Sequence, residues 1–167
     1  MILKIVVLSD THMPNRGKEL PPVLIKELKS AELIIHAGDW NTLEVYEELK
    51  EYGRVEGVSG NTDEQAILDA FPKRQVLNVQ GYSIGVVHGD GTGKTTEKRA
   101  LEAFEENMDI IIFGHSHIPY TRFSSGTLLF NPGSATDKRK HPFYSFGIIE
   151  LGNEVKTQHI FYKNKTG

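Results

Sequence analysis

Short apolar runs alternate with amphipathic stretches in the first half of this chain, and this alternation limits the fold more than any other feature. Ile2–Leu8, Leu33–Ala37 and Arg54–Val58 are rich in aliphatic and β-branched residues, which is typical of strands. Leu20–Lys29 shows helical spacing of apolar residues, and a second such stretch follows Thr42, a candidate N-cap. A β-α-β order of this kind predicts parallel strands joined by right-handed crossovers.

The second half predicts mainly antiparallel pairing. Two strands flank Gln80-Gly81 as a hairpin, a helix and a strand follow, and four short strands separated by turn residues suggest a meander. In order, these elements are Gln75–Val79, Tyr82–Val87, the helix Thr95–Glu106, Asp109–Phe113, Thr121–Phe123, Thr127–Phe130, Tyr144–Leu151 and Val155–Phe161. We therefore expect an α/β protein with two packed mixed β-sheets flanked by helices, a four-layer αββα arrangement.

Length and composition narrow the class of protein. The 167 residues predict one domain over residues 1–167, and the net charge of −3 gives no electrostatic footprint for nucleic acid. The chain has no cysteine, which excludes disulfides, zinc–thiolate sites and a cysteine nucleophile. No apolar run approaches the ~20 residues of a membrane span, and Met1–Leu8 is too short for a secretory signal. We expect a cytoplasmic protein with no membrane partner.

Seven side chains with oxygen or nitrogen donors stand where predicted strands end. They are Asp10, His12, Asp39, Asn61, His88, His115 and His117. Ligation by oxygen and imidazole without sulfur favours Mn²⁺, Ni²⁺, Fe²⁺, Zn²⁺ or Mg²⁺ in a five- or six-coordinate site over structural zinc. Seven ligands exceed what one ion holds beside water, so we expect two ions. With Asp39 as a shared bridge, two ions about 3.5–4 Å apart would suit the clamping of a phosphoryl group.

The order of these motifs resembles the calcineurin-like metallophosphoesterase family. The order is Asp-x-His at Asp10–His12, Gly-Asp at Gly38–Asp39, Gly-Asn at Gly60–Asn61, His-Gly at His88–Gly89 and Gly-His-x-His at Gly114–His117. The resemblance is strongest to the small single-domain bacterial and archaeal phosphodiesterases of the family, which also carry an Asn-Pro-Gly-Ser run such as Asn131–Ser134.

This resemblance implies a ligand set for each ion. It places Asp10, His12, Asp39 and His117 on the first ion, and Asp39, Asn61, His88 and His115 on the second. Mn²⁺ is the first expectation for the metal. Asp39 and Asn61 are also expected to act in catalysis, by fixing the nucleophile, a hydroxide that bridges the two ions, and a phosphoryl oxygen. The implied partner is a small phosphate ester, and a homo-oligomer is an open possibility.

The sequence departs from the common family pattern at Thr62. In most members of the family a histidine follows Gly-Asn, and this histidine is thought to protonate the leaving group or to stabilise the transition state. This chain has Thr62 at that position, and threonine cannot act as a general acid near neutral pH. General acid catalysis is typically worth about 10²- to 10⁴-fold. We therefore expect slow turnover, biased towards phosphodiesters or activated esters with good leaving groups.

Two other functions remain open. A eukaryotic retromer subunit resembles this family, lacks the same histidine and serves as a scaffold, so a non-catalytic interaction module is one alternative. A phosphomonoesterase or nuclease would use the same metals and is the other. The complete set of seven donors favours an enzyme, because buried carboxylates and imidazoles cost stability without a metal.

Several remaining residues invite a functional interpretation. His36 lies in an apolar strand, and we expect it to orient a ligand or to contact substrate. Gly91–Thr95 has the wrong glycine spacing for a nucleotide P-loop, although Lys94 could contact a phosphate. Lys138–Lys140 is a candidate for substrate capture. Turn chemistry alone explains Asn131–Ser134, and His141 and His159 are interpreted as surface or structural residues.

Overall fold

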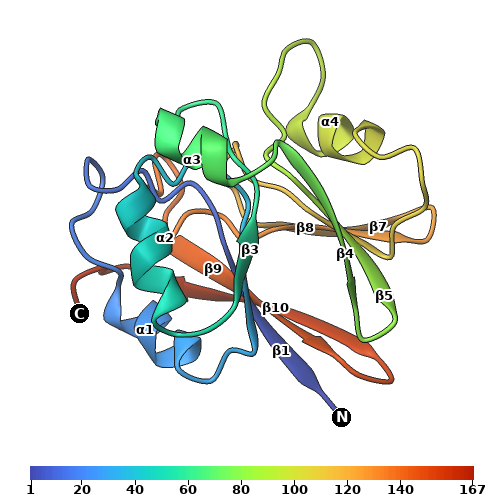
Figure 1. The fold of residues 1–167 in the computed structure, drawn as a ribbon, viewed down its shortest axis with the longest axis horizontal. Coiled ribbons are helices and arrows are strands. Elements are labelled where there is room, and N and C mark those ends of the chain that lie inside the picture. The colour runs from blue at the N-terminus through green and yellow to red at the C-terminus, as the bar shows by residue number, and fades with distance from the viewer.

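Ten strands and four helices make up the structure, a computed structural model that describes residues 1–167. In chain order the elements are β1 (Leu3–Leu8), α1 (Pro22–Leu28), β2 (Leu33–His36), α2 (Leu43–Lys50), β3 (Val55–Gly57), α3 (Gln65–Ala70), β4 (Arg74–Val79), β5 (Tyr82–Val87), α4 (Thr96–Glu102), β6 (Ile110–Ile112), β7 (Tyr120–Ser124), β8 (Thr127–Asn131), β9 (Tyr144–Leu151) and β10 (Val155–Tyr162). The strands form two five-stranded sheets, ordered β10-β9-β1-β2-β3 and β4-β5-β6-β8-β7 (Figure 1).

Strand pairing confirms the predicted parallel core of the first sheet. β1 pairs parallel with β2, with Val6 opposite Ile34, and β2 pairs parallel with β3. The predicted hairpin of β4 and β5 is also present, with Val79 opposite Tyr82. In the second sheet β6 pairs parallel with both β5 and β8. Both sheets are therefore mixed; the second has a parallel centre, whereas the parallel strands of the first lie at one side and end at β3.

The predicted C-terminal meander is wrong. β7–β8 and β9–β10 are hairpins, but the chain leaves the second sheet after β8, and β9 pairs antiparallel with β1 in the first sheet. Ser145–Ile149 of β9 is buried on both faces, so this strand needs a neighbour on each side and a covered position. The free edge of β1 provides that position. Local turn signals cannot reveal such a change of sheet.

Two helices differ from the sequence prediction. α4 ends at Glu102, four residues before the predicted end at Glu106. α3 was not predicted; it is only six residues long, and it stops before Phe71, whose extended conformation is typical of a residue before proline. Thr42 occupies the N-cap of α2, yet its hydroxyl donates to Met13 O instead of capping the helix.

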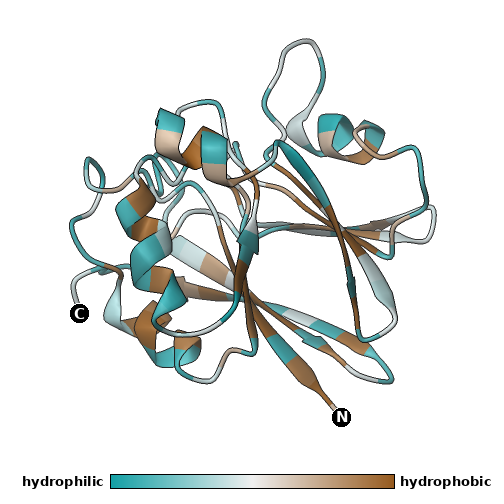
Figure 2. Ribbon diagram, viewed as in Figure 1, coloured by the Kyte–Doolittle hydropathy of each residue, from teal (hydrophilic) through white to brown (hydrophobic).

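Three apolar clusters define the layers. One lies between the sheets and includes Val7 and Ile112, a second joins the first sheet to α1, α2 and α3, and a third joins the second sheet to Ala100 of α4 and to Phe104 just beyond it. Figure 1 shows α1–α3 on the side of β1–β3 and α4 beside the second sheet, while Figure 2 shows apolar residues concentrated on the strands and the inner helix faces. The predicted αββα order is confirmed. No helix has the length and hydropathy needed to span a bilayer.

Candidate metal centre

The predicted ligands lie in loops at the carboxyl ends of five strands. Asp10 and His12 follow β1, Asp39 follows β2, Asn61 follows β3, His88 follows β5, and His115 and His117 follow β6. Parallel neighbours open their loops at the same edge of a sheet. Backbone hydrogen bonds join these loops, since Asp10 N–H donates to Gly38 O at 2.9 Å and Gly114 N–H donates to His88 O at 3.0 Å. The fold thus gathers loops that are far apart in the sequence.

Left-handed backbone is concentrated in these loops. Nine residues other than glycine have positive φ, and five of them are predicted ligands, namely Asp10, His12, Asp39, His115 and His117. L-residues rarely adopt this region because the Cβ atom then crowds the backbone. Such strain persists only where surrounding contacts fix it, and it clusters at functional sites. The backbone conformation therefore identifies the rim formed by these loops as a functional site, independently of the side chains.

Glycines precede ligands in the motifs because the ligands pack on the glycine backbone. A Cβ atom at Gly60 would lie 2.2 Å from Asp39 Oδ1, and one at Gly114 would lie 1.9 Å from Ser9 Oγ and 2.8 Å from Asp10 Oδ2. Real Cβ contacts are never this short, so any larger residue would displace a carboxylate. Glycine is thus required in the Gly-Asn and Gly-His motifs, because the neighbouring side chains approach its backbone too closely for a Cβ atom.

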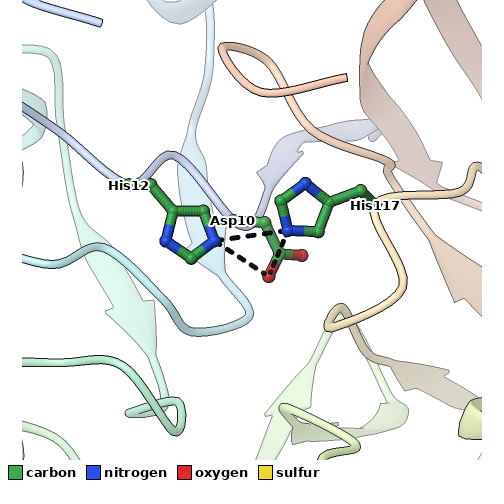
Figure 3. Close-up of side chains that lie close together, drawn as sticks. All are labelled: Asp10, His12 and His117. Carbon is green, nitrogen blue, oxygen red and sulfur yellow. Dashed lines mark hydrogen bonds and ion pairs between the residues drawn. The ribbon is translucent and has the colours of Figure 1, made fainter. Parts of the chain in front are cut away.

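Asp10, His12 and His117 form a first buried triad. The Nε2 atoms of His12 and His117 lie 4.0 and 3.6 Å from Asp10 Oδ1, and 3.2 Å from each other. Figure 3 shows the two rings directed at this carboxylate oxygen from either side. All three ligand atoms lie within 4.8 Å of one another, so one divalent cation could contact them together.

Asp10, Asp39 and His88 form a second buried triad. His88 Nε2 lies 3.1 Å from Asp39 Oδ2 and 3.7 Å from Asp10 Oδ1. Asp39 Oδ2 also lies 3.6 Å from His12 Nε2 of the first triad. The sequence interpretation made Asp39 the shared ligand, whereas the geometry places both carboxylates centrally. The bridging role of Asp39 stays a prediction.

Each central carboxylate has one oxygen held by donors and one left open. Asp10 Oδ2 accepts hydrogen bonds from the Ser9 hydroxyl at 2.8 Å and from His115 N–H at 2.9 Å, whereas the buried Asp10 Oδ1 has no hydrogen-bond partner. Asp39 Oδ1 accepts from Thr62 N–H at 3.0 Å, and Asp39 Oδ2 faces the histidines. A buried acceptor without a donor costs free energy. A cation between the triads would satisfy it.

Three histidines are oriented through their second ring nitrogen. The Nδ1 atoms of His12, His88 and His117 lie 2.9, 2.7 and 2.5 Å from oxygens of Asn41, Ala37 and Asp137, respectively. Because these oxygens only accept, Nδ1 carries a proton in each ring, which leaves Nε2 as the nitrogen that can bind a metal. Histidines that bind metals are commonly held this way. His88 Nε2, moreover, is buried without a hydrogen bond, so the donor set fits two divalent ions.

Charge pairing dominates the electrostatics of the two triads. Burial lowers the pKa of His88, but the negative charges of Asp10 and Asp39 outweigh it and raise that pKa to about 9. Burial raises the pKa of Asp39, yet the approach of His88 Nε2 to 3.1 Å and the hydrogen bond from Thr62 N–H hold it well below its usual value. The proton on His88 offsets part of the carboxylate charge. A divalent cation would take the place of that proton.

Asn61 and His115 lie beside the triads without joining them. His115 is half-buried, and its ring packs edge-on against His88 with 5.3 Å between centroids. Asn61 is exposed and lines a hollow of about 330 Å³ together with Asp63, Lys73 and Asp90. The structure thus places five of the seven predicted ligands in the triads. Roles for Asn61 and His115 on the second ion stay predictions.

His36 holds two ligand loops together. It is fully buried, accepts a hydrogen bond from Gly38 N–H at 3.1 Å through Nδ1, and lies 3.1 Å from Thr11 Oγ1 through Nε2. Its ring stacks on Trp40 with 4.0 Å between centroids. Burial lowers the pKa of His36, so the ring is neutral near pH 7. Of the two predicted roles, orientation fits, whereas contact with substrate is wrong because the side chain is inaccessible.

Asp63 was missed by sequence reasoning and clamps two loops. Its Oδ2 accepts hydrogen bonds from Asp39 N–H at 3.0 Å and Gly60 N–H at 2.6 Å, and its Oδ1 accepts from Asn41 N–H at 2.8 Å. Burial raises the pKa of Asp63 despite these donors. Its place directly after Gly60-Asn61-Thr62 was the available signal. Thr62 itself is exposed, and its hydroxyl donates to Asn41 Oδ1 at 3.2 Å.

Asn131–Ser134 does more than turn the chain. The Ser134 hydroxyl donates to Asp10 O at 2.7 Å, and Asn131 Nδ2 donates to Gly114 O at 3.0 Å. Thr136, just beyond, donates to Thr11 O at 2.5 Å. This segment therefore fastens the loops after β1 and β6, and turn chemistry alone was an incomplete explanation.

The glycine-rich segment before α4 serves the helix. Thr95 caps α4 by accepting a hydrogen bond from Lys98 N–H, and Lys94 forms an ion pair with Glu102. Lys94 is thus engaged within its own element. This arrangement agrees with the rejection of a P-loop from its spacing.

Two mixed sheets flanked by helices, with buried Asp/His triads at the loop rim, define a metallohydrolase with a candidate binuclear site. The calcineurin-like phosphoesterase superfamily domain matches residues 3–154, and the chain belongs to this family. It is a metallophosphoesterase by this membership and by its metal-binding clusters.

Similar proteins come from archaea, bacteria and eukaryotes. A protein of Methanothermobacter thermautotrophicus, named a probable metallophosphoesterase, is 35% identical over 135 residues, which are 80% of this chain and 77% of the relative. The structure of Vps29 complexed with Zn²⁺ from Entamoeba histolytica is 25% identical, covers 95% of this chain and 99% of its own, and has a TM-score of 0.74. An archaeal phosphodiesterase has the same fold, with a TM-score of 0.72 at 22% identity over 96% of this chain and 100% of its own.

Proposed function

We propose that this protein is a phosphodiesterase that uses two divalent ions to hydrolyse small phosphate diesters or activated phosphate esters. The observation that carries the proposal is the pair of orphaned buried atoms, Asp10 Oδ1 and His88 Nε2, inside two triads that share a carboxylate. Mn²⁺ is the first choice because oxygen and imidazole ligands suit it, and Ni²⁺, Fe²⁺, Zn²⁺ and Mg²⁺ are the other candidates.

Each part of the rim has a distinct role in the proposed reaction. Two bound ions would activate water for attack on phosphorus and neutralise charge on the phosphoryl oxygens. Asp39 accepts a hydrogen bond from Thr62 N–H and faces both His12 and His88, so it would keep the two ions in fixed positions relative to each other. The exposed amide of Asn61 would donate to a phosphoryl oxygen. The P–O bond to the leaving group breaks, and the products are a phosphate monoester and an alcohol.

Thr62 supports diesters and activated esters over ordinary monoesters. It is exposed beside His12 and Asn41, and its hydroxyl cannot protonate a leaving oxygen near neutral pH. Leaving groups that depart as stable anions need no such acid. The fold shared with an archaeal phosphodiesterase agrees with this choice.

The rival function is a non-catalytic interaction module. Vps29, which is named for vacuolar protein sorting, shares the fold, and the Entamoeba histolytica protein was crystallised with Zn²⁺. A protein named for a role other than hydrolysis can thus bind a metal, so metal binding alone does not separate an enzyme from an interaction module. Only turnover does. A phosphomonoesterase or nuclease would share the metals and differ in the preferred ester.

The deciding experiment strips the protein of metal and adds each ion back. We expect Mn²⁺ to restore hydrolysis of bis(4-nitrophenyl) phosphate, with two ions bound per chain and weaker activity on 4-nitrophenyl phosphate. Asp39→Asn should lower kcat/KM by at least about 100-fold, the scale for losing a preorganised charged group. Asp69→Asn, exposed on α3, is the matched control and should not change the rate. Two bound ions without any turnover, or full activity in Asp39→Asn, would contradict the proposal.

A further inference from the structure

A hollow of about 640 Å³ opens next to the metal centre. Ser116 and Ile118 line it on the β6 side, and Lys138, Arg139, Lys140 and His141 line it from the loop before β9. This volume lies within the ~300–1,000 Å³ of small-molecule sites. Because the residues of the metal triads are buried, the organic part of an ester would lie in a neighbouring space of this kind.

The surface of the hollow is mostly apolar, and the residues around it carry positive charge without an acidic partner. Lys138, Arg139 and Lys140 are consecutive, none of them forms an ion pair, and no aspartate or glutamate lines the hollow. Asp137, which precedes Lys138 in the chain, has its carboxylate 3.8 Å from Arg16 Nε. The chain as a whole carries a net charge of −3, so this local excess of three cations is a feature of the site and not of the composition.

The loop that carries the three cations is anchored to the loops of the metal ligands. Ser116 separates the two ligands His115 and His117, and His117 Nδ1–H donates to Asp137 O, immediately before Lys138. Asp137 N–H in turn donates to Ser134 Oγ at 2.9 Å, and that hydroxyl donates to the backbone of Asp10. Lys138 Nζ also lies over the Tyr144 ring, 5.7 Å from its centroid. The loop is therefore anchored to both sides of the first triad.

The lining suits an ester arm with an apolar body and an anionic end. Ile118, which is 54% exposed, and the methylene stems of the lysines offer apolar surface, while the ammonium and guanidinium groups offer charge-assisted hydrogen bonds. An extended nucleic acid strand fits less well. The hollow beside Asn61 is lined by two aspartates, Asp63 and Asp90, and one lysine, Lys73, so a long polyanion crossing the centre would meet more carboxylates than cations there.

We propose that Lys138, Arg139 and Lys140 bind a second anionic group of the substrate, a phosphate or a carboxylate on the ester arm that projects from the scissile phosphate. The inference rests on the proposed phosphodiesterase function and narrows its substrates to small phosphodiesters that carry an additional anion. The basic run determines specificity, and the triads carry out the reaction on the shared phosphate.

A matched pair of substrates tests the proposal. Ethyl 4-nitrophenyl phosphate and 2-phosphonoethyl 4-nitrophenyl phosphate share a leaving group and differ in the additional anion. With the Mn²⁺-loaded protein we expect kcat/KM to favour the phosphonate by at least about ten-fold, the scale of one charged hydrogen bond. The ratio should fall towards one in Arg139→Gln/Lys140→Gln, and part of the way in Lys140→Gln. Lys26→Gln, an exposed lysine of α1, should leave the ratio and the rate on the ethyl ester unchanged.

Each other outcome overturns a specific claim. A native ratio near one, or the same ratio in the double variant, overturns the anionic subsite. A rate that keeps rising with the length of an oligonucleotide ester assigns the hollow to nucleic acid and also overturns it. If the ethyl ester is not hydrolysed with any metal, the proposed function fails by itself. Calorimetric affinities of the two esters for the metal-loaded protein then replace kcat/KM: the subsite holds if the phosphonate binds more tightly and the double variant loses that preference, and it falls otherwise.

Discussion

The histidines of the metal centre differ in what orients them. His88 and His117 donate from Nδ1 to backbone oxygens, whereas His12 donates to the side chain of Asn41. Asn41 also has a left-handed backbone with φ 78°, a conformation that asparagine, aspartate and glycine tolerate. The orientation of His12 can therefore be removed by substitution without straining the chain.

Replacing Asn41 by glycine should weaken the first metal site. Asn41→Gly keeps the backbone conformation but removes the acceptor, so His12 loses its fixed tautomer and direction. We expect metal affinity to fall by about 10- to 100-fold, as for other residues that hold a ligand. Asn41→Asp retains an acceptor oxygen and is the matched control. Titration against a competing chelator gives the affinities, and equal losses in both variants would refute the role of the acceptor.

At residue scale, the motifs identified the donors but not their supports. Aspartate, histidine and asparagine beside glycine at strand ends are informative as an ordered set, and the sequence placed all seven at the correct rim. Asn41 and Ser134 are ordinary turn residues by sequence, and their contacts with His12 and Asp10 cross long stretches of chain. No local pattern predicts such contacts.

At the scale of elements, the loops after β2 and β3 behave as one unit because Asp63 joins them. Its carboxylate accepts three backbone hydrogen bonds, from Asp39, Asn41 and Gly60. These three hydrogen bonds fix the left-handed turn that carries Asp39. The clamp thus connects a strand pair of the first sheet to the position of a central ligand.

Asp63→Asn should loosen this unit. An amide has one acceptor oxygen and a donor NH₂ group, so at least one buried N–H would lose its acceptor, at a cost of about 1–3 kcal/mol of unfolding free energy. Weaker metal binding should accompany the loss. Urea denaturation of the metal-free protein measures the first effect, with Asp69→Asn on the exposed part of α3 as the control. An unchanged midpoint in Asp63→Asn would show that the clamp is unimportant.

Element prediction succeeded where periodicity was strong. The parallel strands β1–β3 and the β4–β5 hairpin were predicted from apolar runs and turn residues. The sheet assignment of β9 was not, because its sequence fits either sheet and the free edge of β1 exists only in the folded chain. α3 was missed since six residues carry too little periodicity.

At the scale of the whole molecule, β10 of the first sheet also contacts the second sheet. His159 stacks on Phe130 of β8 with 4.5 Å between centroids, and its Nε2–H donates to Asn131 O at 2.7 Å. Burial lowers the pKa of His159 below its usual 6.5, although the hydrogen bond to Asn131 opposes the shift. The folded protein therefore prefers a neutral ring here.

Acid should weaken this contact between the sheets. Because the folded-state pKa of His159 is lowered, its contribution to stability is complete above pH 6.5 and is lost as the pH falls from there towards the folded-state pKa. We expect the native protein to lose more stability between pH 7 and 5 than His159→Gln, which keeps an N–H donor and does not titrate. Thermal unfolding of both proteins across this range measures the difference, and parallel curves would contradict the assignment.

The sequence by itself determined where the candidate donors stand, at the ends of strands, and that two sheets with outer helices form the protein, because apolar periodicity and turn chemistry are local properties. Tertiary structure decided that Asp10 and Asp39 both lie between the histidines, that Asp63, Asn41 and Ser134 hold the ligand loops, and that Lys138–Lys140 lies beside them. These relations join positions up to 124 residues apart in the chain. They follow from packing two sheets together, and no window of sequence contains that information.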